Sequence, residues 1–393
     1  MPDAAPHPDL AWRPLTPADI PAWHRMIVAT EAVDEPDEHF TPEDLGDELG
    51  APSVDPAVDS RAALTPDGEI LAAGLSTARP MGGPMRRYDF WGAVHPAWRG
   101  QGLGRRLLAW QIERAAERHA QDAPDVPGWA GLGAEEKRED VWRLAARAGL
   151  TPLRWFTTLH RPLTTTAPLD PVDLAPGLHL VPLGEDLDEA VRLAHNDAWT
   201  DHWGYAASPA ADWNARVVGL RNLRRDWSHV VVDEAGDVVG YALNVSFEQD
   251  WEVQGFKEGY TLLLGVRRPW RGQGVAKALL TAADRAFREA GMEVAALDVD
   301  SENPTGALQL YQGLGYGPVN RTALLATRFD PVIPACPPCW RLQCALWRPF
   351  EPLEAIRSGL RSPARGAGRW GPGSLRRCGR RGRRCGRSGR SPG

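Results

Sequence analysis

The stretch Trp270-Arg271-Gly272-Gln273-Gly274-Val275-Ala276 decides the fold, because it occurs twice. An earlier copy, Trp98-Arg99-Gly100-Gln101-Gly102-Leu103-Gly104, stands 172 residues before it. In each copy an apolar run ends at Val94 or Val266, a turn containing proline follows, and an amphipathic helix begins directly after the glycines. Free backbone N–H groups and the positive end of a helix dipole therefore coincide in both turns. The repeat predicts a duplicated α/β domain whose turns can bind a diphosphate.

The boundary between the two domains is marked by four prolines and a threonine run between His160 and Gly177. Each proline removes a backbone donor and biases the preceding residue away from helix, so this segment reads as a linker. We expect a first domain over residues 1–165, a linker over 166–177, a second domain over 178–330 and a tail over 331–393.

Hydrophobic periodicity predicts the same order of elements in both domains. In the second domain we expect strands at 178–182, 229–233, 238–246, 260–266 and 294–299, and helices within 187–198, 209–223, 275–290 and 305–314. In the first we expect strands at 62–64, 70–76 and 89–94, followed by a helix from Leu103. The predicted fold class is therefore α/β of the α+β type, with a mixed, mostly antiparallel sheet flanked by helices in each domain.

Charge separates the tail from the body. Residues 331–393 contain 14 arginines and two acidic residues, a net charge of +12, which leaves −18 on residues 1–330 of the total of −6. Such a body disfavours nucleic acid and anionic membranes as partners, and its composition, without an apolar leader or span, indicates a cytoplasmic protein. The tail is expected to be a disordered basic extension; a frameshift product and an RNA-binding arm are the alternatives.

All five cysteines lie in the tail, so the body uses neither disulfides nor a cysteine nucleophile. The pair Cys336 and Cys339 has the spacing of a zinc or redox site, but neither a second well-spaced pair nor a tail histidine accompanies it. We therefore expect no metal.

With the segment Asn303-Pro304-Thr305-Gly306-Ala307-Leu308-Gln309-Leu310-Tyr311, the second copy resembles the GNAT superfamily of acyl-CoA-dependent N-acetyltransferases. The resemblance implies two tandem GNAT domains with acetyl-CoA as co-substrate. It assigns pyrophosphate contacts to Arg271, Gly272, Gln273, Gly274, Val275 and Ala276, and pantetheine contacts to Leu264, Gly265 and Val266. It further assigns Asn303 to cofactor binding and Tyr311 to protonation of the departing CoA thiolate.

The first copy departs from this pattern. Alignment through the following glycines places Ala145 opposite Tyr311 and Lys137 opposite Asn303, so the thiolate acid is missing. The turn itself is intact, and Arg99, Gly100, Gln101, Gly102, Leu103 and Gly104 are its candidate cofactor contacts. This domain either binds acetyl-CoA or serves as a scaffold, and we expect catalysis in the second domain.

Amide formation also requires a neutral amine, and therefore a base. Glu258 is our candidate because it shares strand parity with Tyr260; Glu252, Asp298, Asp300 and a purely surface role for Glu258 are the alternatives. The segment between the first two helices of the second domain carries Trp199, His202 and Trp203, which are predicted to contact the acceptor. The alternative is that both tryptophans belong to the core.

The predicted activity is transfer of an acetyl group from acetyl-CoA to an amine of a small molecule or peptide, by direct attack in a ternary complex. The duplicated layout is similar to that of the mycothiol synthase family, which acetylates a cysteinyl pseudodisaccharide, and to tandem aminoglycoside-type acetyltransferases. The alternative function is a non-catalytic acyl-CoA sensor or assembly module. We expect no membrane partner, and nucleic acid only through the basic tail.

Overall fold

The structure, a computed structural model, describes residues 10–36, 38–79, 85–164, 169–303 and 306–331. We call residues 10–164 the first half and residues 169–331 the second half. Apart from Pro331, the predicted tail with its cysteines lies outside the described residues. Among the helices that are described, none combines the length and apolar character needed to span a bilayer.

The strands of the first half are β1 (Ala11–Arg13), β2 (Ser60–Leu64), β3 (Ile70–Ala78), β4 (Arg86–Val94), β5 (Gly128–Glu135) and β6 (Thr151–Pro162). Those of the second half are β7 (His179–Pro182), β8 (His229–Val232), β9 (Val238–Val245), β10 (Glu258–Val266), β11 (Val294–Asp300) and β12 (Gly317–Phe329).

The α-helices of the first half are α1 (Ile20–Asp34), α2 (Pro42–Leu49), α3 (Pro56–Asp59), α4 (Leu103–Asp122) and α5 (Glu139–Arg147). Those of the second half are α6 (Asp188–Ala198), α7 (Ala210–Trp213), α8 (Trp251–Gln254), α9 (Val275–Glu289) and α10 (Ala307–Gly313). Short 3-10 turns η2 (Pro96–Trp98) and η6 (Arg268–Trp270) precede the two glycine turns.

The helix expected within 209–223 is shorter and irregular. It divides into α7 and a π-helical turn, η4 (Asn214–Val218), and Gly219 N–H closes that turn on the Asn214 carbonyl at 2.8 Å. A Cβ at position 219 would lie 2.3 Å from the Asn214 oxygen, so this wide turn requires glycine.

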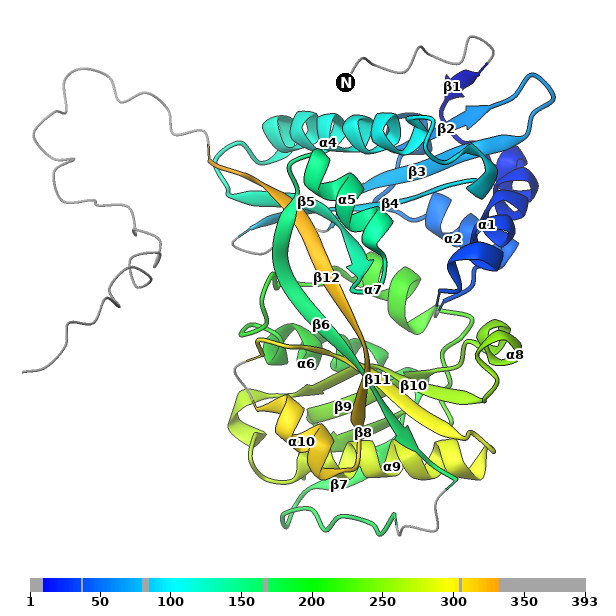
Figure 1. Cartoon of the computed structure of the whole chain (residues 1–393). Helices are drawn as coiled ribbons and strands as arrows, with labels where there is room; N and C mark the ends of the chain where they lie inside the picture. The colour runs from blue at the N-terminus through cyan, green and yellow to red at the C-terminus, as the bar shows by residue number, and fades with distance from the viewer. Residues whose placement is uncertain (1–9, 37, 80–84, 165–168, 304–305, 332–393) are drawn as a thin grey trace, which may run out of the picture. The chain divides into compact units, whose positions relative to one another are not determined.

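All described strands join one sheet, in the order β1-β2-β3-β4-β5-β12-β6-β11-β10-β9-β8-β7. The two halves exchange their last strands. The strand β6, from the first half, pairs with β11, whereas β12, from the second half, pairs with β5. Figure 1 shows β6 and β12 running side by side from one half into the other, in agreement with their long antiparallel register. The described residues accordingly belong to one compact unit.

Among the described strands two pairs are parallel, β4 with β5 and β10 with β11, and the other pairs are antiparallel. The β10–β11 pairing has only three register pairs, from Glu258 with Val294 to Tyr260 with Ala296. Beyond them the two strands diverge, and the β11 side of β10 is left without a strand partner. The predicted mixed, mostly antiparallel sheet is confirmed.

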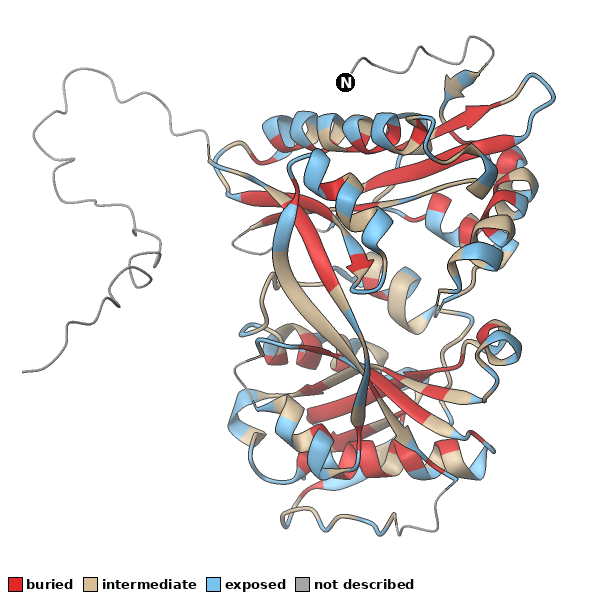
Figure 2. Cartoon of the chain, viewed as in Figure 1, coloured by how far each residue is buried: buried red, intermediate tan, exposed pale blue. Residues whose placement is uncertain are grey.

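Helices cover both faces of the sheet in each half. The helix α9 packs on β8, β9 and β10 from one side and α6 packs on β9 and β10 from the other. The buried positions of α9 include Val275, Leu279, Ala283 and Phe287, as the 3.6-residue spacing predicts. In Figure 2 the central strands β3 and β9 are red along most of their length, because helices cover both of their faces.

Candidate active site

A cavity of about 460 Å³ lies in the second half, where β10 and β11 diverge. Its walls come from the end of β10, the glycine turn and start of α9, the end of β11, α10, and the segment 198–203 that follows α6. The lining includes thirteen of the residues predicted from the resemblance: Leu264, Gly265, Val266, Arg271, Gly272, Gly274, Val275, Ala276, Asn303, Tyr311, Trp199, His202 and Trp203. Two predicted residues, Gln273 and Glu258, do not line it.

A β-bulge marks the cavity wall formed by β10. The register between β10 and β9 shifts between Thr261 and Leu263, so that Leu262 is the extra residue, and it lines the cavity. The register of β4 with β3 has no such shift. The two halves therefore differ in the backbone of this strand. Bulges change the direction of a strand and often lie beside active sites.

The glycine turn leaves room for a ligand. Gly272 and Gly274 have φ of 74° and 82°, a region that favours glycine, and a Cβ at Gly272 would meet no atom within 4 Å. The helix α9 begins at Val275, so its first N–H groups have no partner within the helix. Backbone donors and the helix dipole thus point into open space, which suits an anionic group.

The arginine of the motif has a structural role in both copies. Arg271 Nε donates to the Val266 carbonyl at 3.1 Å, and Arg99 Nε donates to the Val94 carbonyl at the same distance. The other guanidinium nitrogens of Arg271 bind Asp201 at 2.9 Å and the Ala198 carbonyl at 2.6 Å. The side chain therefore fastens the glycine turn to the end of β10 and to the segment after α6.

The side chain of Gln273 also serves the turn, since its amide nitrogen donates to the Pro269 carbonyl at 3.0 Å. Gly265 has a separate packing role. A Cβ there would lie 2.5 Å from the buried ring of Tyr241, the residue of β9 that pairs with Gly265 in the sheet. Glycine at this position is thus required by the close approach of Tyr241.

Tyr311 projects from α10 into the cavity wall and is 8% exposed. Burial raises the pKa of its hydroxyl to about 12, so it keeps its proton at neutral pH. A protonated phenol beside a cavity is a possible proton donor to a leaving group.

The four carboxylates considered as bases have different surroundings. Glu258 Oε2 lies 3.3 Å from His160 Nε2, and Glu258 is outside the cavity lining. Asp300 lines the cavity but forms a two-point ion pair with Arg154. Asp298 lines the cavity, is exposed, and accepts a hydrogen bond from the Tyr260 hydroxyl. Glu252, on α8, is exposed and is not in the lining.

The alternation of side chains along β11 places Tyr311, the candidate acid, and the carboxylates of Asp298 and Asp300 on opposite faces of the strand. Leu297 and Val299 pack in the core cluster that contains Tyr311 and α9 residues, so Asp298 and Asp300 face the opposite side of the strand. That is the side on which the segment after α6 lies. A ligand between β10 and β11 would therefore have Tyr311 on one side and Asp298 on the other.

The predicted acceptor contacts Trp199, His202 and Trp203 all line the cavity. The His202 ring packs on Trp199, with ring centroids 4.4 Å apart and planes tilted by 39°, and its Nδ1 donates to the Trp203 carbonyl at 3.0 Å. Burial lowers the pKa of His202, so the ring is neutral at pH 7 and Nε2 carries the lone pair. Trp203 also packs against a buried cluster around Trp129, so it has a core contact as well as a place in the cavity lining, and its contact with the acceptor stays a prediction.

The corresponding region of the first half has different contacts around its glycine turn. Leu144, which aligns with Leu310, stands 3.5 Å from where a Cβ of Gly104 would be. Arg99 makes two hydrogen bonds to Asp34, at 2.6 and 2.7 Å, and Arg138 reaches the same carboxylate at 3.1 Å. The remaining turn residues, Gly100, Gln101, Gly102 and Leu103, lie between η2 and the start of α4. Ala145 is fully buried.

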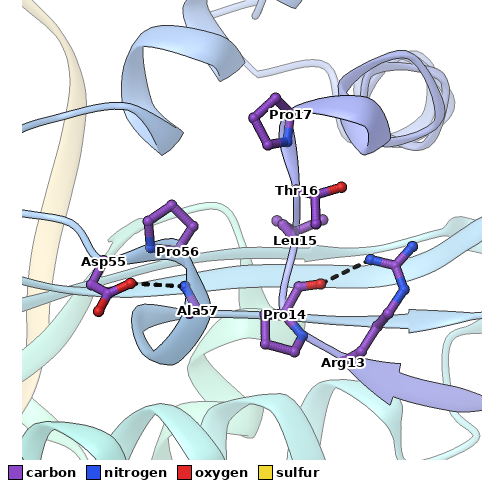
Figure 3. Close-up of a pocket in the computed structure, with 8 residues that line it drawn as sticks. All are labelled: Arg13, Pro14, Leu15, Thr16, Pro17, Asp55, Pro56 and Ala57. Carbon is purple, nitrogen blue, oxygen red and sulfur yellow. Dashed lines mark hydrogen bonds between the residues drawn. The ribbon is translucent and has the colours of Figure 1, made fainter.

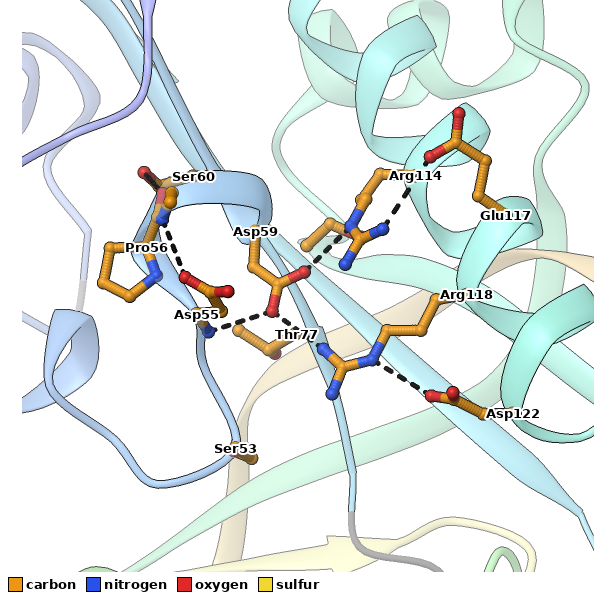
Figure 4. A network of polar contacts seen from close by, with 12 residues as sticks. Ser53, Asp55, Pro56, Asp59, Ser60, Thr77, Arg114, Glu117, Arg118 and Asp122 are labelled. Atoms are coloured by element: carbon orange, nitrogen blue, oxygen red, sulfur yellow. Dashed lines mark hydrogen bonds and ion pairs between the residues drawn. The ribbon is translucent and has the colours of Figure 1, made fainter.

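A second hollow, of about 570 Å³, is lined by Arg13, Pro14, Leu15, Thr16, Pro17, Asp55, Pro56 and Ala57 (Figure 3). Its two charged side chains already have structural partners. Arg13 binds Asp19, and the Asp55 carboxylate caps α3 by accepting from Ala57 N–H at 3.1 Å. Figure 4 shows that Asp55 N–H in turn donates to Asp59, which anchors Arg114 and Arg118 of α4. This hollow therefore lacks the free polar groups of a catalytic site.

Comparison with known proteins agrees with the geometry of the second half. Residues 28–123 and 186–316 match the model of the Acetyltransferase (GNAT) family. The chain belongs to the GNAT acetyltransferase family. Members of this family use acyl-CoA donors, and the chain is accordingly an acyltransferase enzyme, as predicted. The duplicated match also confirms two tandem GNAT units in sequence.

Among related sequences, a mycothiol acetyltransferase from Thermobispora bispora is 31% identical over 264 residues, covering 65% of this chain and 80% of the relative. A mycothiol acetyltransferase from Sanguibacter keddieii is 29% identical over 320 residues, covering 78% of this chain and 93% of the relative.

Two solved structures share the fold of this GNAT protein. A GCN5-related N-acetyltransferase from Sphaerobacter thermophilus superposes with a TM-score of 0.64 at 24% identity, covering 85% of this chain and 98% of that one. A tandem GNAT protein from the clavulanic acid biosynthesis pathway superposes with a TM-score of 0.61 at 19% identity, covering 82% and 99%. The predicted fold class is confirmed.

Sequence reasoning did not select Asp201 or Arg154 as site residues. Asp201 stands in the aromatic segment already singled out, and its pKa is lowered by hydrogen bonds from Arg271 and Arg268. A carboxylate in that segment, together with the motif arginine Arg271 and the neighbouring Arg268, was a signal for this pairing. Arg154 had no such signal, since it is 146 residues from its partner Asp300 and belongs to the other half.

Proposed function

We propose that this GNAT protein transfers an acetyl group from acetyl-CoA to a primary amine, by direct attack in a ternary complex, within the cavity of the second half. The observation that carries the proposal is the composition of that cavity. It brings the open glycine turn, the unpaired edge of β10 and Tyr311 together around one space. The turn would hold the CoA pyrophosphate, and Leu264, Gly265 and Val266 would pair with pantetheine.

In the proposed reaction the neutral amine attacks the thioester carbonyl, so that a C–N bond forms and the C–S bond breaks. Tyr311 donates its proton to the CoA thiolate as it leaves, which its raised pKa allows by keeping the hydroxyl protonated. Asn303, at the start of the loop to α10, would contact the cofactor near the same point.

The placement of the carboxylates favours Asp298 over Glu258 as the base that takes the amine proton. Asp298 lines the cavity on the side opposite Tyr311, and Tyr260 orients its carboxylate. Glu258, in contrast, is paired with His160. Asp300 is held by Arg154 in a two-point ion pair, so its charge is compensated. The exposed carboxylate of Asp298 is the one that would attract an ammonium group before its deprotonation.

The acceptor that we propose is a cysteinyl amine of the kind borne by the precursor of mycothiol. Support comes from the relatives named mycothiol acetyltransferase and from the aromatic segment Trp199 to Trp203, which offers rings against which a sugar or a cysteinyl side chain can pack. The first half, with the buried Ala145 in place of the acid, would act as a scaffold.

The test is a turnover assay of the full chain with acetyl-CoA and the cysteinyl pseudodisaccharide precursor of mycothiol, followed by mass spectrometry of the product. We expect CoA release that depends on the acceptor and a product acetylated on nitrogen. Release of CoA at the same rate with and without any amine in a panel of small-molecule and peptide acceptors would contradict the proposal.

A further inference from the structure

Arg154 connects the first half to the end of β11. It lies on β6, the strand that the first half contributes beside β11. Its Nε and Nη2 donate to the two carboxylate oxygens of Asp300 at 2.9 and 2.7 Å. The Asp300 side chain is only 2% exposed, so this pair is largely removed from solvent. Arg154 thereby fixes the orientation of one residue of the cavity wall.

The same guanidinium also contacts Trp203, a second residue of the cavity wall. Arg154 Cζ lies 5.4 Å from the centre of the Trp203 ring, within the range of a cation–π contact. Trp203 further stacks on Trp129 of β5, with ring centroids 5.6 Å apart and planes at 14°. Both partners of this tryptophan belong to the first half.

One further contact holds the same segment from the first half. Arg87 Nη1 donates to the Gly204 carbonyl at 2.7 Å, and its guanidinium lies 5.3 Å from the Trp129 ring centre. The other end of the segment is fixed within the second half, where Asp201 binds Arg271. The segment 199–205 is thus anchored at the glycine turn by one half and at β11 by the other.

We infer that Arg154 is a positioning residue, which holds Trp203 and Asp300 in place on two walls of the cavity and so makes acceptor binding depend on the first half. This inference rests on the proposed function. It gives the first half a role in the reaction that does not require it to bind acetyl-CoA.

Arginine is needed at position 154 because one side chain performs two tasks. Its planar fork matches both oxygens of Asp300, while its flat face lies over an indole ring. A lysine in its place would keep the positive charge beside Asp300 but would lose the two-point geometry and the stacked contact. Arg154→Lys therefore removes the contacts that position Asp300 and Trp203 while it retains the positive charge.

A matched control lies on the same strand. Arg161 on β6 pairs with the fully buried Asp284 of α9 at 2.5 Å, and its side chain is 13% exposed, as is that of Arg154. Its partner does not line the cavity. Arg161→Lys therefore perturbs an ion pair between the halves of similar burial without touching the segment 199–205.

The experiment compares wild type, Arg154→Lys and Arg161→Lys by two readouts. Hydrogen exchange followed by mass spectrometry reports the protection of the segment 199–205. Steady-state kinetics with the cysteinyl pseudodisaccharide precursor of mycothiol reports KM for the acceptor and for acetyl-CoA. We expect Arg154→Lys to speed exchange in 199–205 and to raise the acceptor KM about tenfold, with the acetyl-CoA KM unchanged. Arg161→Lys should do neither.

Unchanged exchange in 199–205 for Arg154→Lys would overturn the inference, whatever the activity. So would equal increases in both KM values, or the same acceptor KM effect in Arg161→Lys, because these outcomes indicate a general loss of structure. If wild type shows no turnover with any amine, the proposed function fails, and the exchange readout still decides whether Arg154 positions the segment. Trp203→Leu, which removes the stacked ring and leaves the Arg154–Asp300 pair, should reproduce the acceptor KM effect.

Discussion

Tyr311 meets Tyr316 edge to face, with ring centroids 6.2 Å apart, and the Tyr316 hydroxyl donates to Asp284 at 2.6 Å. Because the contact between the two tyrosines uses their rings, Tyr311→Phe should keep the packing of α10 and remove only the hydroxyl. We predict that kcat falls by about 10²-fold, the scale of a lost general acid, while the affinity for acetyl-CoA is retained.

Single-turnover kinetics and acetyl-CoA binding measured on the same preparation check this prediction. A Tyr311→Phe variant with wild-type kcat would remove the acid role. A variant that loses acetyl-CoA affinity to the same extent as kcat would instead assign Tyr311 to binding.

The assignment of the base is tested by Asp298→Asn against Glu258→Gln. We predict that Asp298→Asn lowers kcat by about 10²-fold at pH 7 and that part of the loss is recovered at higher pH, where more of the amine is already neutral. Glu258→Gln should have a smaller effect, since its carboxylate is paired with His160 outside the cavity. The reverse ranking in a pH–rate series would return the role to Glu258.

The stability of the second half should depend on the protonation of His195. Its ring is buried between Trp199 and Trp213, with Nδ1 2.6 Å from the Tyr241 hydroxyl, and burial lowers its pKa to about 4. Between pH 6.5 and 4 the unfolded chain therefore binds a proton that the folded chain does not. We predict that the free energy of unfolding falls by about 3 kcal/mol over this window as pH decreases.

Urea unfolding of wild type and His195→Gln at pH 7, 5 and 4 isolates this contribution from that of the other buried histidines. The variant should lose less stability on acidification than wild type. Parallel pH dependences for the two proteins would show that His195 does not couple folding to pH in this range.

The first half offers a test of stability that should leave the reaction intact. Asp59 is 1% exposed and accepts from Arg114 at 2.9 Å and from Arg118 at 2.8 Å (Figure 4). Asp59→Ala leaves two arginines without this partner, and we predict a loss of about 3 kcal/mol in the free energy of unfolding.

Asp122, the exposed partner of Arg118, provides the matched control. Its replacement by alanine should cost about 0.5 kcal/mol or less, as is usual for surface pairs. Denaturant titrations measure both variants, and kcat of folded Asp59→Ala should equal that of wild type. Equal losses in the free energy of unfolding of the two variants would contradict the prediction that the buried ion pairs of Asp59 stabilise the fold more than the exposed pair of Asp122.

Much of the fold could be predicted because its determinants are local. The glycines at 272 and 274, the 3.6-residue spacing of α9 and the apolar run of β10 act within a few residues of each other. The strand exchange of β6 and β12 could not be predicted: neither strand is among those expected from the sequence, and neither has a regular apolar alternation that would mark it as a strand. Pairing between residues far apart leaves no local sequence signal.

The candidate site likewise combines features that depend on local sequence with features that depend on contacts between distant residues. The glycine turn and Tyr311 belong to motifs that can be recognised residue by residue. Glu258 and Asp298 share a face of the sheet, since Glu258 is in register with Val294 and Asp298 follows four residues later on β11. They differ in how far along the diverging strands they lie and in their partners, and the pairing of Glu258 with His160 of the other half leaves no local sequence signal.

We expect one acetyl-CoA site per chain, at the glycine turn of the second half. Gly272 and Gly100 have φ of 74° and 77°, and a Cβ at either would meet no atom within 4 Å, so valine introduces the same backbone strain at each. The most direct test is calorimetric titration of the full chain, Gly272→Val and Gly100→Val with acetyl-CoA. We expect about one site in wild type and in Gly100→Val, and none in Gly272→Val. Retained binding in Gly272→Val with loss in Gly100→Val, or no binding in wild type, would contradict it.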